Sequence, residues 1–156
     1  MFRVVYVSSA SSSFTPENLT RLLETARRAN EAADITGMLV YCKGEFLQAL
    51  EGPPAAVRET FARIEGDQRH RDTVQLQRGE ASRLFVNWAM GFSNLDRQAA
   101  LSGFVQVNDR LNLRRLDAMA ALDFLTASAA AQLDQKRSSD STAFAVAFLI
   151  ARVRLI

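Results

Sequence analysis

Apolar and polar positions along the first half of the chain follow two periods, and the change between them predicts its elements. Residues 2–7 are almost all apolar, with β-branched or aromatic side chains, which predicts a strand. After a polar loop at 8–13, the Thr-Pro-Glu sequence at 15–17 is typical of a helix start. Apolar residues three and four apart then predict a helix to about Ala33. Its apolar face contains Leu19, Leu22, Leu23, Ala26 and Ala29.

Two β-like runs, 36–42 and 45–50, flank a Lys-Gly pair and predict a hairpin. The Gly-Pro-Pro sequence at 52–54 precedes a second helix that ends at Gly66-Asp67. Its apolar face is formed by Val57, Phe61 and Ile64. Residues 73–78 and 84–92 predict two further strands. The order βαββαββ predicts an α+β, ferredoxin-like fold, in which two helices cover one face of a mixed five-stranded sheet.

The predicted strands carry apolar side chains on both faces. Alternation places Phe2, Val4 and Tyr6 on one side of the first strand and Val5 and Val7 on the other. On the third strand, Phe46, Gln48 and Leu50 lie on one face, and Leu47 and Ala49 lie on the other. The two helices cover one face, so we expect the chain after residue 95 to cover the other.

The C-terminal part of the chain predicts helices with an apolar face that could cover this second sheet face. Residues 108–136 predict a helix, and a shorter helix at 96–104 precedes it. The apolar stripe of the longer helix contains Ala118, Leu122, Leu125, Ala129 and Leu133. We therefore expect a domain at 1–95, helices at 96–136 on the second sheet face, and a linker with an apolar tail at 137–156. The pattern leaves the tail open between helix and strand, and we expect it to bury against its own domain or a partner chain.

Composition narrows the classes of protein. The chain has 156 residues, 48% apolar and 23% charged, as in ordinary globular proteins. A net charge of +2 is too small to predict a nucleic-acid partner. The single cysteine excludes an intrachain disulfide and favours a reducing, cytoplasmic compartment. The first residues indicate a strand rather than a signal peptide, and the apolar tail is shorter than the roughly 20 residues that span a bilayer, so no membrane partner is expected.

Common catalytic motifs are missing from the sequence. The glycines form neither a G-x-G-x-x-G fingerprint nor a P-loop. One histidine and one cysteine are too few for a metal cluster of these ligands. Cys42 and His70 could in principle form a nucleophilic pair. Cys42 lies inside a predicted strand, however, which favours a buried small residue.

Three polar side chains lie on elements that should pack together. Tyr6 and Gln48 are on predicted buried strands, and Asn30 follows the apolar face of the first helix. A buried amide without partners costs about 1–3 kcal/mol. Either a polar ligand lies among these groups, or they satisfy one another in a core network. The pattern leaves both interpretations open.

Four blocks occur in order: Asn30 with Asp-Ile-Thr-Gly at 34–37, Phe-Leu-Gln-Ala-Leu-Glu-Gly at 46–52, Asp-Gln-Arg-His at 67–70, and Arg-Leu-Phe-Val-Asn-Trp-Ala-Met-Gly-Phe at 83–92. In these blocks the sequence resembles the BLUF family, sensors of blue light using FAD, over about residues 1–95. The family fold agrees with the elements predicted from the hydrophobic pattern. One departure is Ala29, where some relatives carry His or Arg near the ring.

The resemblance implies non-covalently bound FAD, for which FMN or riboflavin could substitute. It implies that Tyr6 is the photoactive tyrosine and that Gln48 is the switching glutamine between Tyr6 and the flavin. Other implied cofactor-binding residues are Leu22, Asn30, Phe46, Arg63, Ile64, Asp67, Arg69 and His70. A solvated turn is the alternative for Arg69 and His70. Trp88 and Met90 are implied to relay the signal, and plain core filling is their alternative.

The implied function is blue-light sensing without enzyme activity, with a signal passed to a separate partner protein. The helical extension and the apolar tail also favour a homo-oligomer. Two other classes stay open at this stage. One is a flavin-dependent redox enzyme, and the other is a flavin-free, ferredoxin-like interaction module.

Overall fold

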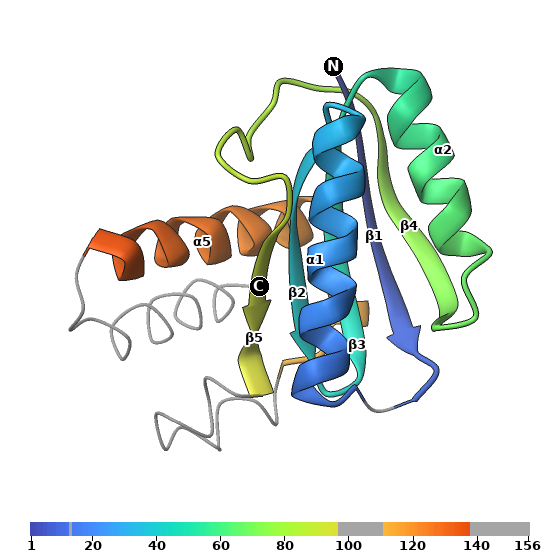
Figure 1. Cartoon of the computed structure of the whole chain (residues 1–156), viewed down its shortest axis with the longest axis vertical. Helices are drawn as coiled ribbons and strands as arrows, with labels where there is room; N and C mark the ends of the chain where they lie inside the picture. Colours follow the sequence, from blue (N-terminus) through green and yellow to red (C-terminus); the bar gives the residue numbers. More distant parts are fainter. Residues whose placement is uncertain (13, 97–110, 138–156) are drawn as a thin grey trace.

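A mixed five-stranded sheet in the order β4-β1-β3-β2-β5 forms the centre of the computed structural model, which describes residues 1–12, 14–96 and 111–137 (Figure 1). Neighbouring strands are antiparallel except for the parallel pair β2–β5. The strands are β1 (Phe2–Ala10), β2 (Thr36–Cys42), β3 (Glu45–Gly52), β4 (His70–Glu80) and β5 (Gly91–Asn94). The helices are α1 (Pro16–Ala32), α2 (Pro54–Glu65), the 3-10 turn η1 (Leu113–Arg115) and α5 (Ala118–Arg137).

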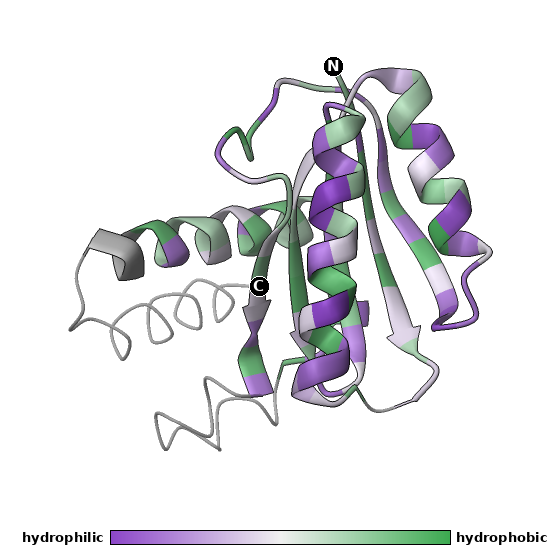
Figure 2. Cartoon of the chain, viewed as in Figure 1, coloured by the Kyte–Doolittle hydropathy of each residue, from purple (hydrophilic) through white to green (hydrophobic). Residues whose placement is uncertain are grey.

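The layers follow from the alternation of side chains along the strands. Helices α1 and α2 lie on one face, and α5 crosses the opposite face at a steep angle to the strands (Figure 1). Tyr6 and Phe46 belong to the apolar cluster under α1 and α2, whereas Val5 and Leu47 belong to the cluster under α5. In Figure 2, residues of high hydropathy, drawn green, recur along the central strands. The predicted α+β, ferredoxin-like arrangement is confirmed.

Local sequence explains the helix ends and the hairpin. Thr15 caps α1, since its hydroxyl oxygen accepts a hydrogen bond from Asn18 N at 3.2 Å. Proline occupies the first turn of both α1 and α2. In the β2–β3 hairpin, Lys43 and Gly44 have φ angles of 48° and 76°, the left-handed pair of a type I′ turn.

The 3-10 turn η1 and helix α5 cover the second face of the sheet. Ala121, Phe124 and Leu125 of α5 are buried against the sheet together with Leu113 of η1. The predicted stripe is only partly correct, because Leu133 is 36% exposed. The predicted helix at 96–104 and the tail lie almost entirely outside the described residues, and no helix among the described residues is long and apolar enough to cross a membrane.

The strand predicted at 84–92 is wrong over most of its length, since only Gly91–Asn94 forms β5. The backbone N–H groups of Leu84 and Phe85 donate to Glu51 Oε2 at 2.8 and 3.0 Å. Glu51 is itself paired with Arg3 at 2.6 Å, and both side chains are buried. The N–H groups of Leu84 and Phe85 are thus unavailable to a strand ladder, and residues 81–90 form a loop.

Two other boundaries differ from the prediction. The polar loop expected from residue 8 begins later, because β1 pairs with β3 through Ser9 and with β4 through Ala10. The long C-terminal helix begins at Ala118, where the side chain of Asp117 accepts a hydrogen bond from Ala120 N at 2.8 Å. The bond of Asp117 is local, whereas the hydroxyls of Ser8 and Ser9 bind His70 and Arg114, which are distant in sequence.

Candidate functional site

A phenol, a carboxamide and a thioether are joined at the centre of the sheet. The register of β1 and β3 places Tyr6 directly opposite Gln48. The Tyr6 hydroxyl donates a hydrogen bond to Gln48 Oε1. Gln48 Nε2 in turn donates to the sulfur of Met90 at 3.3 Å. All three residues are buried, so this chain of contacts runs through the apolar cluster under α1 and α2.

Electrostatics fix the direction of the Tyr6–Gln48 hydrogen bond. Burial raises the pKa of the Tyr6 phenol well above its ordinary value, and the negative charge of Asp67 adds to the effect. Tyr6 is therefore a protonated donor, and Gln48 presents its carbonyl oxygen to it. Sulfur is a weak acceptor, so the amide N–H on the other side has only a modest partner. The Gln48 side chain is thus buried with little to hold it in one orientation.

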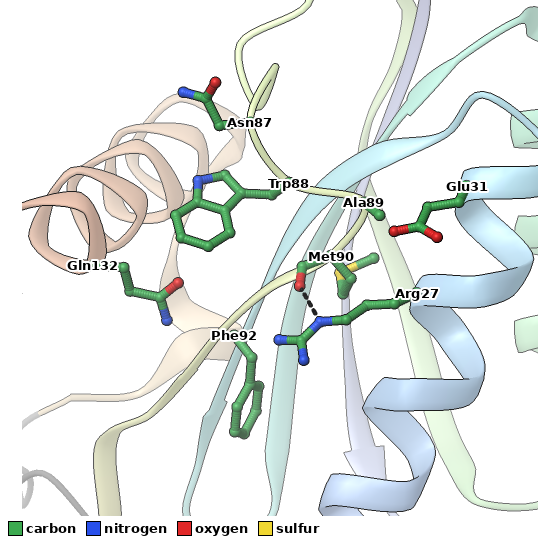
Figure 3. Close-up of a pocket in the computed structure, with 8 residues that line it drawn as sticks. All are labelled: Arg27, Glu31, Asn87, Trp88, Ala89, Met90, Phe92 and Gln132. Carbon is green, nitrogen blue, oxygen red and sulfur yellow. Dashed lines mark hydrogen bonds between the residues drawn. The ribbon is translucent and has the colours of Figure 1, made fainter. Parts of the chain in front are cut away.

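Asn30 and Arg27, one turn apart on α1, hold the segment that carries Met90. Asn30 is buried, and its Nδ2 donates to the carbonyl of Ala89 at 2.8 Å. Arg27 Nε donates to the carbonyl of Met90 at 2.9 Å (Figure 3). Asn30 was a predicted site residue, whereas Arg27 was not. Arg27 lies on the polar side of α1, and the sequence pattern therefore gave no indication of its contact with Met90.

His70 lies next to Tyr6 and Phe46. Its ring centroid is 5.0 Å from that of Phe46 and 6.4 Å from that of Tyr6. His70 Nδ1 and the hydroxyl of Ser8 are 2.8 Å apart. Burial lowers the pKa of His70, although the charge of Asp67 opposes the shift. Sequence reasoning missed Ser8 because it was assigned to a loop, whereas it is fully buried in β1.

The other charged candidates lie at the solvent edge of the site, where α2 turns into β4. Asp67 Oδ1 accepts hydrogen bonds from the backbone N and Nε of Arg69, both at 2.9 Å. These bonds lower the pKa of Asp67 to about 2. Arg63 is exposed and donates to the Thr60 hydroxyl at 3.0 Å. The structure brings these groups to one end of α2, and a solvated turn still describes Arg69.

Leu22 and Ile64 approach the site from the two helices. Both are partly buried and pack against the apolar cluster that contains Tyr6. Helix α2 approaches β1, β3 and β4 closely, whereas α1 stands further from the sheet. A flat, partly polar ring system fits these residues, because aliphatic side chains flank a floor that carries a phenol and an amide.

Trp88 lines a hollow of about 570 Å³. The hollow is bounded by α1, the loop before β5 and α5 (Figure 3). Its lining residues are Arg27, Glu31, Asn87, Trp88, Ala89, Met90, Phe92 and Gln132. Neither Tyr6 nor Gln48 lines it, so this hollow is distinct from the predicted flavin site. The segment with Met90 separates the two.

The nucleophilic pair considered from the sequence is excluded. Cys42 lies in the cluster under α5, whereas His70 packs with Phe46 on the opposite face. Burial raises the pKa of the Cys42 thiol to about 12, so the thiol stays protonated. Among the described residues, no three His, Cys, Asp or Glu side chains gather as metal ligands.

Several solved structures resemble this one. BlrB, a BLUF protein in its dark state, is 23% identical with a TM-score of 0.67, covering 84% of this chain and 96% of that one, which shows a shared fold. A bacterial light-regulated adenylyl cyclase is 30% identical with a TM-score of 0.59, covering 67% of this chain and 32% of the cyclase.

A curated relative is the photoactivated adenylate cyclase subunit alpha of Euglena gracilis. It is 36% identical over 74 residues, which are 47% of this chain and 7% of the relative. The chain therefore spans less than a tenth of the length of the curated relatives it matches. The cyclase activities named for these proteins belong to chains with much more sequence than this one.

Fold and site together define a light-sensing flavoprotein domain. The sequence model of the family described as sensors of blue-light using FAD matches residues 1–91, more than half of the chain. The chain belongs to this family, BLUF, and is a blue-light sensor with FAD as its chromophore.

Proposed function

We propose that blue light rearranges the hydrogen bond between Tyr6 and Gln48 beside FAD, and that the Met90 segment carries the change toward α5 and a separate protein. The observation that supports this proposal is the continuous path from Tyr6 through Gln48 to the sulfur of Met90. Because the three side chains are buried and in contact, a change in the orientation of Gln48 would directly displace its neighbour Met90.

FAD would be held by side chains, since the chain has no glycine-rich phosphate loop. Leu22 and Ile64 would flank the ring, Asn30 would bond its edge, and Phe46 would pack beside it. His70 and the charged groups at the end of α2 would lie toward the tail; these groups are Arg63, Asp67 and Arg69. Bound FAD absorbs blue light and supplies an excited ring that is a strong oxidant.

Tyr6 can give up one electron to that oxidant. A phenol that loses an electron becomes a strong acid, and its proton can pass to Gln48 Oε1, to which it is already bonded. Burial disfavours a separate phenolate, so the proton does not leave Tyr6 before the electron. When both return to Tyr6, the Gln48 amide is left rotated or tautomerised, with its N–H groups directed differently. The sulfur of Met90 then loses its donor.

The output of this switch is a second part of the proposal. We propose that the flavin domain comprises residues 1–95, that residues 96–136 form the output helices, and that residues 137–156 are a linker and tail. The chain would act without enzyme activity of its own, through light-dependent binding to a separate cytoplasmic protein, and as a homo-oligomer. In support, α5 buries Phe124 and Leu125 against the sheet face behind the switch.

Absorption spectra before and after blue light test the switch. The chain has two tyrosines, so Tyr41→Phe is a matched control for Tyr6→Phe. With FAD bound, the wild type and Tyr41→Phe should show a red shift of the flavin band that reverses in the dark. Tyr6→Phe should bind FAD and show no shift. A normal shift in Tyr6→Phe would remove Tyr6 from the proposed role.

A further inference from the structure

We infer that Arg27 is a positioning residue of the light switch, which fixes the backbone of Met90 so that its sulfur stays within reach of the Gln48 amide. The inference rests on the proposed function, because it concerns the path from Gln48 outward. Arg27 does not touch the phenol or the amide. It acts through the main chain of the residue that does.

The loop before β5 needs such an anchor, because it lies outside the sheet ladder. Three successive carbonyls in it are each held by a different group. Trp88 O accepts from Gly37 N at 3.0 Å, Ala89 O accepts from Asn30 Nδ2, and Met90 O accepts from Arg27 Nε. Two of the three donors are side chains of α1. The position of this segment therefore depends on α1 as much as on the sheet.

The side chain of Met90 has little freedom to correct a displaced backbone. It is 1% exposed, and its sulfur lies 3.3 Å from Gln48 Nε2. A Cβ added to Gly37 would lie 3.4 Å from Met90 Cε, which shows how closely β2 approaches it. Because the thioether lies between Gln48 and β2, a shift of the Met90 main chain moves the sulfur. The Arg27 hydrogen bond thus controls the distance between Gln48 Nε2 and the sulfur of Met90.

The same bond connects the switch to the hollow that faces α5. Arg27 lies on one wall, and Gln132 of α5 lies across from it beside Trp88 (Figure 3). A Cβ added to Gly91 would lie 3.5 Å from Gln132 Oε1. A movement of the Met90 segment would therefore alter the space between α1 and α5, and Arg27 is the α1 side chain that resists this movement at Met90 itself, as Asn30 does at Ala89.

Arg27 and its neighbour Arg28 provide a matched pair of substitutions. Both are exposed arginines in the C-terminal half of α1, but Arg28 makes no hydrogen bond or ion pair with any described residue. Arg27→Ala and Arg28→Ala remove the same charge from the same helix. Arg27→Lys keeps the charge and one donor, and should restore part of the function.

The experiment uses the full chain with FAD bound. Arg27→Ala should keep the red shift but return to the dark state at least about threefold more slowly, because the sulfur is no longer presented to the returning amide. Arg28→Ala should behave like the wild type, and Arg27→Lys should lie between the two. Infrared spectra with ¹³C-labelled methionine carbonyls give a second readout. The Met90 band, identified by its loss in Met90→Leu, should shift to higher frequency in dark-state Arg27→Ala.

Equal recovery rates and an equal Met90 band in the two alanine variants would overturn the role of Arg27. That result would leave the red shift intact, so the proposed function would stand. A wild type without any red shift would instead overturn the proposed function, and it would be seen before the variants are compared.

Discussion

The two faces of the sheet are built from the same strands but for different purposes. Under α1 and α2, the apolar cluster contains the Tyr6–Gln48 pair, with Asn30 and His70 close by. Under α5, the cluster is hydrocarbon with the sulfurs of Met38 and Cys42, and the buried ion pair of Arg3 and Glu51 lies at one end of the sheet.

The difference lies in how well the polar groups are satisfied. Glu51 accepts from Arg3 and from two backbone N–H groups, so both of its oxygens have strong partners. Gln48 has a phenol on one side and only a thioether on the other. A fully paired network is rigid, whereas a weakly paired amide can exchange partners at low cost. The comparison supports the proposal that the Gln48 amide exchanges partners, while the Arg3–Glu51 pair stays in place.

Gln48→Leu should abolish the proposed switch. The carboxamide is replaced by a hydrocarbon of similar size, so FAD should stay bound while the light-induced red shift disappears. The absorption spectrum before and after blue light measures this. Leu47→Met is the control on the opposite face, because a volume-conserving change there costs under about 1.5 kcal/mol and should leave the shift unchanged. A red shift in Gln48→Leu would contradict the account.

Glu51→Ala should break the buried ion pair. It leaves the buried charge of Arg3 and the N–H groups of Leu84 and Phe85 without their acceptor. Removal of one partner of a buried pair costs about 3–5 kcal/mol of unfolding free energy, measurable by urea denaturation. The double variant Arg3→Met with Glu51→Leu should lose less, because no charge remains buried alone. A loss below about 1 kcal/mol in Glu51→Ala would show that the pair is solvated.

Leu125→Ala tests whether α5 serves mainly as a cover. Leu125 is fully buried in the cluster under α5, and its truncation should cost about 2–5 kcal/mol of unfolding free energy. The red shift should persist, since the change is on the other face. Met119 on the same helix is 76% exposed, so Met119→Ala should stay within about 0.5 kcal/mol of the wild type. If the two variants had equal free energies of unfolding, the packing of α5 against the sheet would not contribute to the stability of the protein.

His70 gives the smallest effect. Burial holds its folded-state pKa below the ordinary value of about 6.5, although Asp67 opposes the shift. Below that pH the unfolded chain binds more protons than the folded chain, so the free energy of unfolding should fall as the pH drops through about 6.5. This is the only histidine, so His70→Asn should flatten the pH dependence there. Identical pH profiles for the variant and the wild type would place His70 in solvent.

Much of this molecule was predictable from the sequence, and the exceptions share a cause. Hydrophobic periodicity predicted both helices, the hairpin and the need for a cover on the second face. It failed at residues 84–90, where the carboxylate of Glu51, distant in sequence, accepts hydrogen bonds from the N–H groups of Leu84 and Phe85. The resemblance pointed to Tyr6 and Gln48. It could not indicate Arg27, whose contact depends on where α1 meets the loop in space.

The most direct test is whether light changes the phenol of Tyr6. Light-minus-dark infrared spectra of FAD-loaded protein with ring-deuterated tyrosine report on both tyrosines of the chain. The account predicts tyrosine bands that change with blue light in the wild type and in Tyr41→Phe, and that are absent in Tyr6→Phe and Gln48→Leu. A normal red shift of the flavin without any change in the tyrosine bands would contradict it.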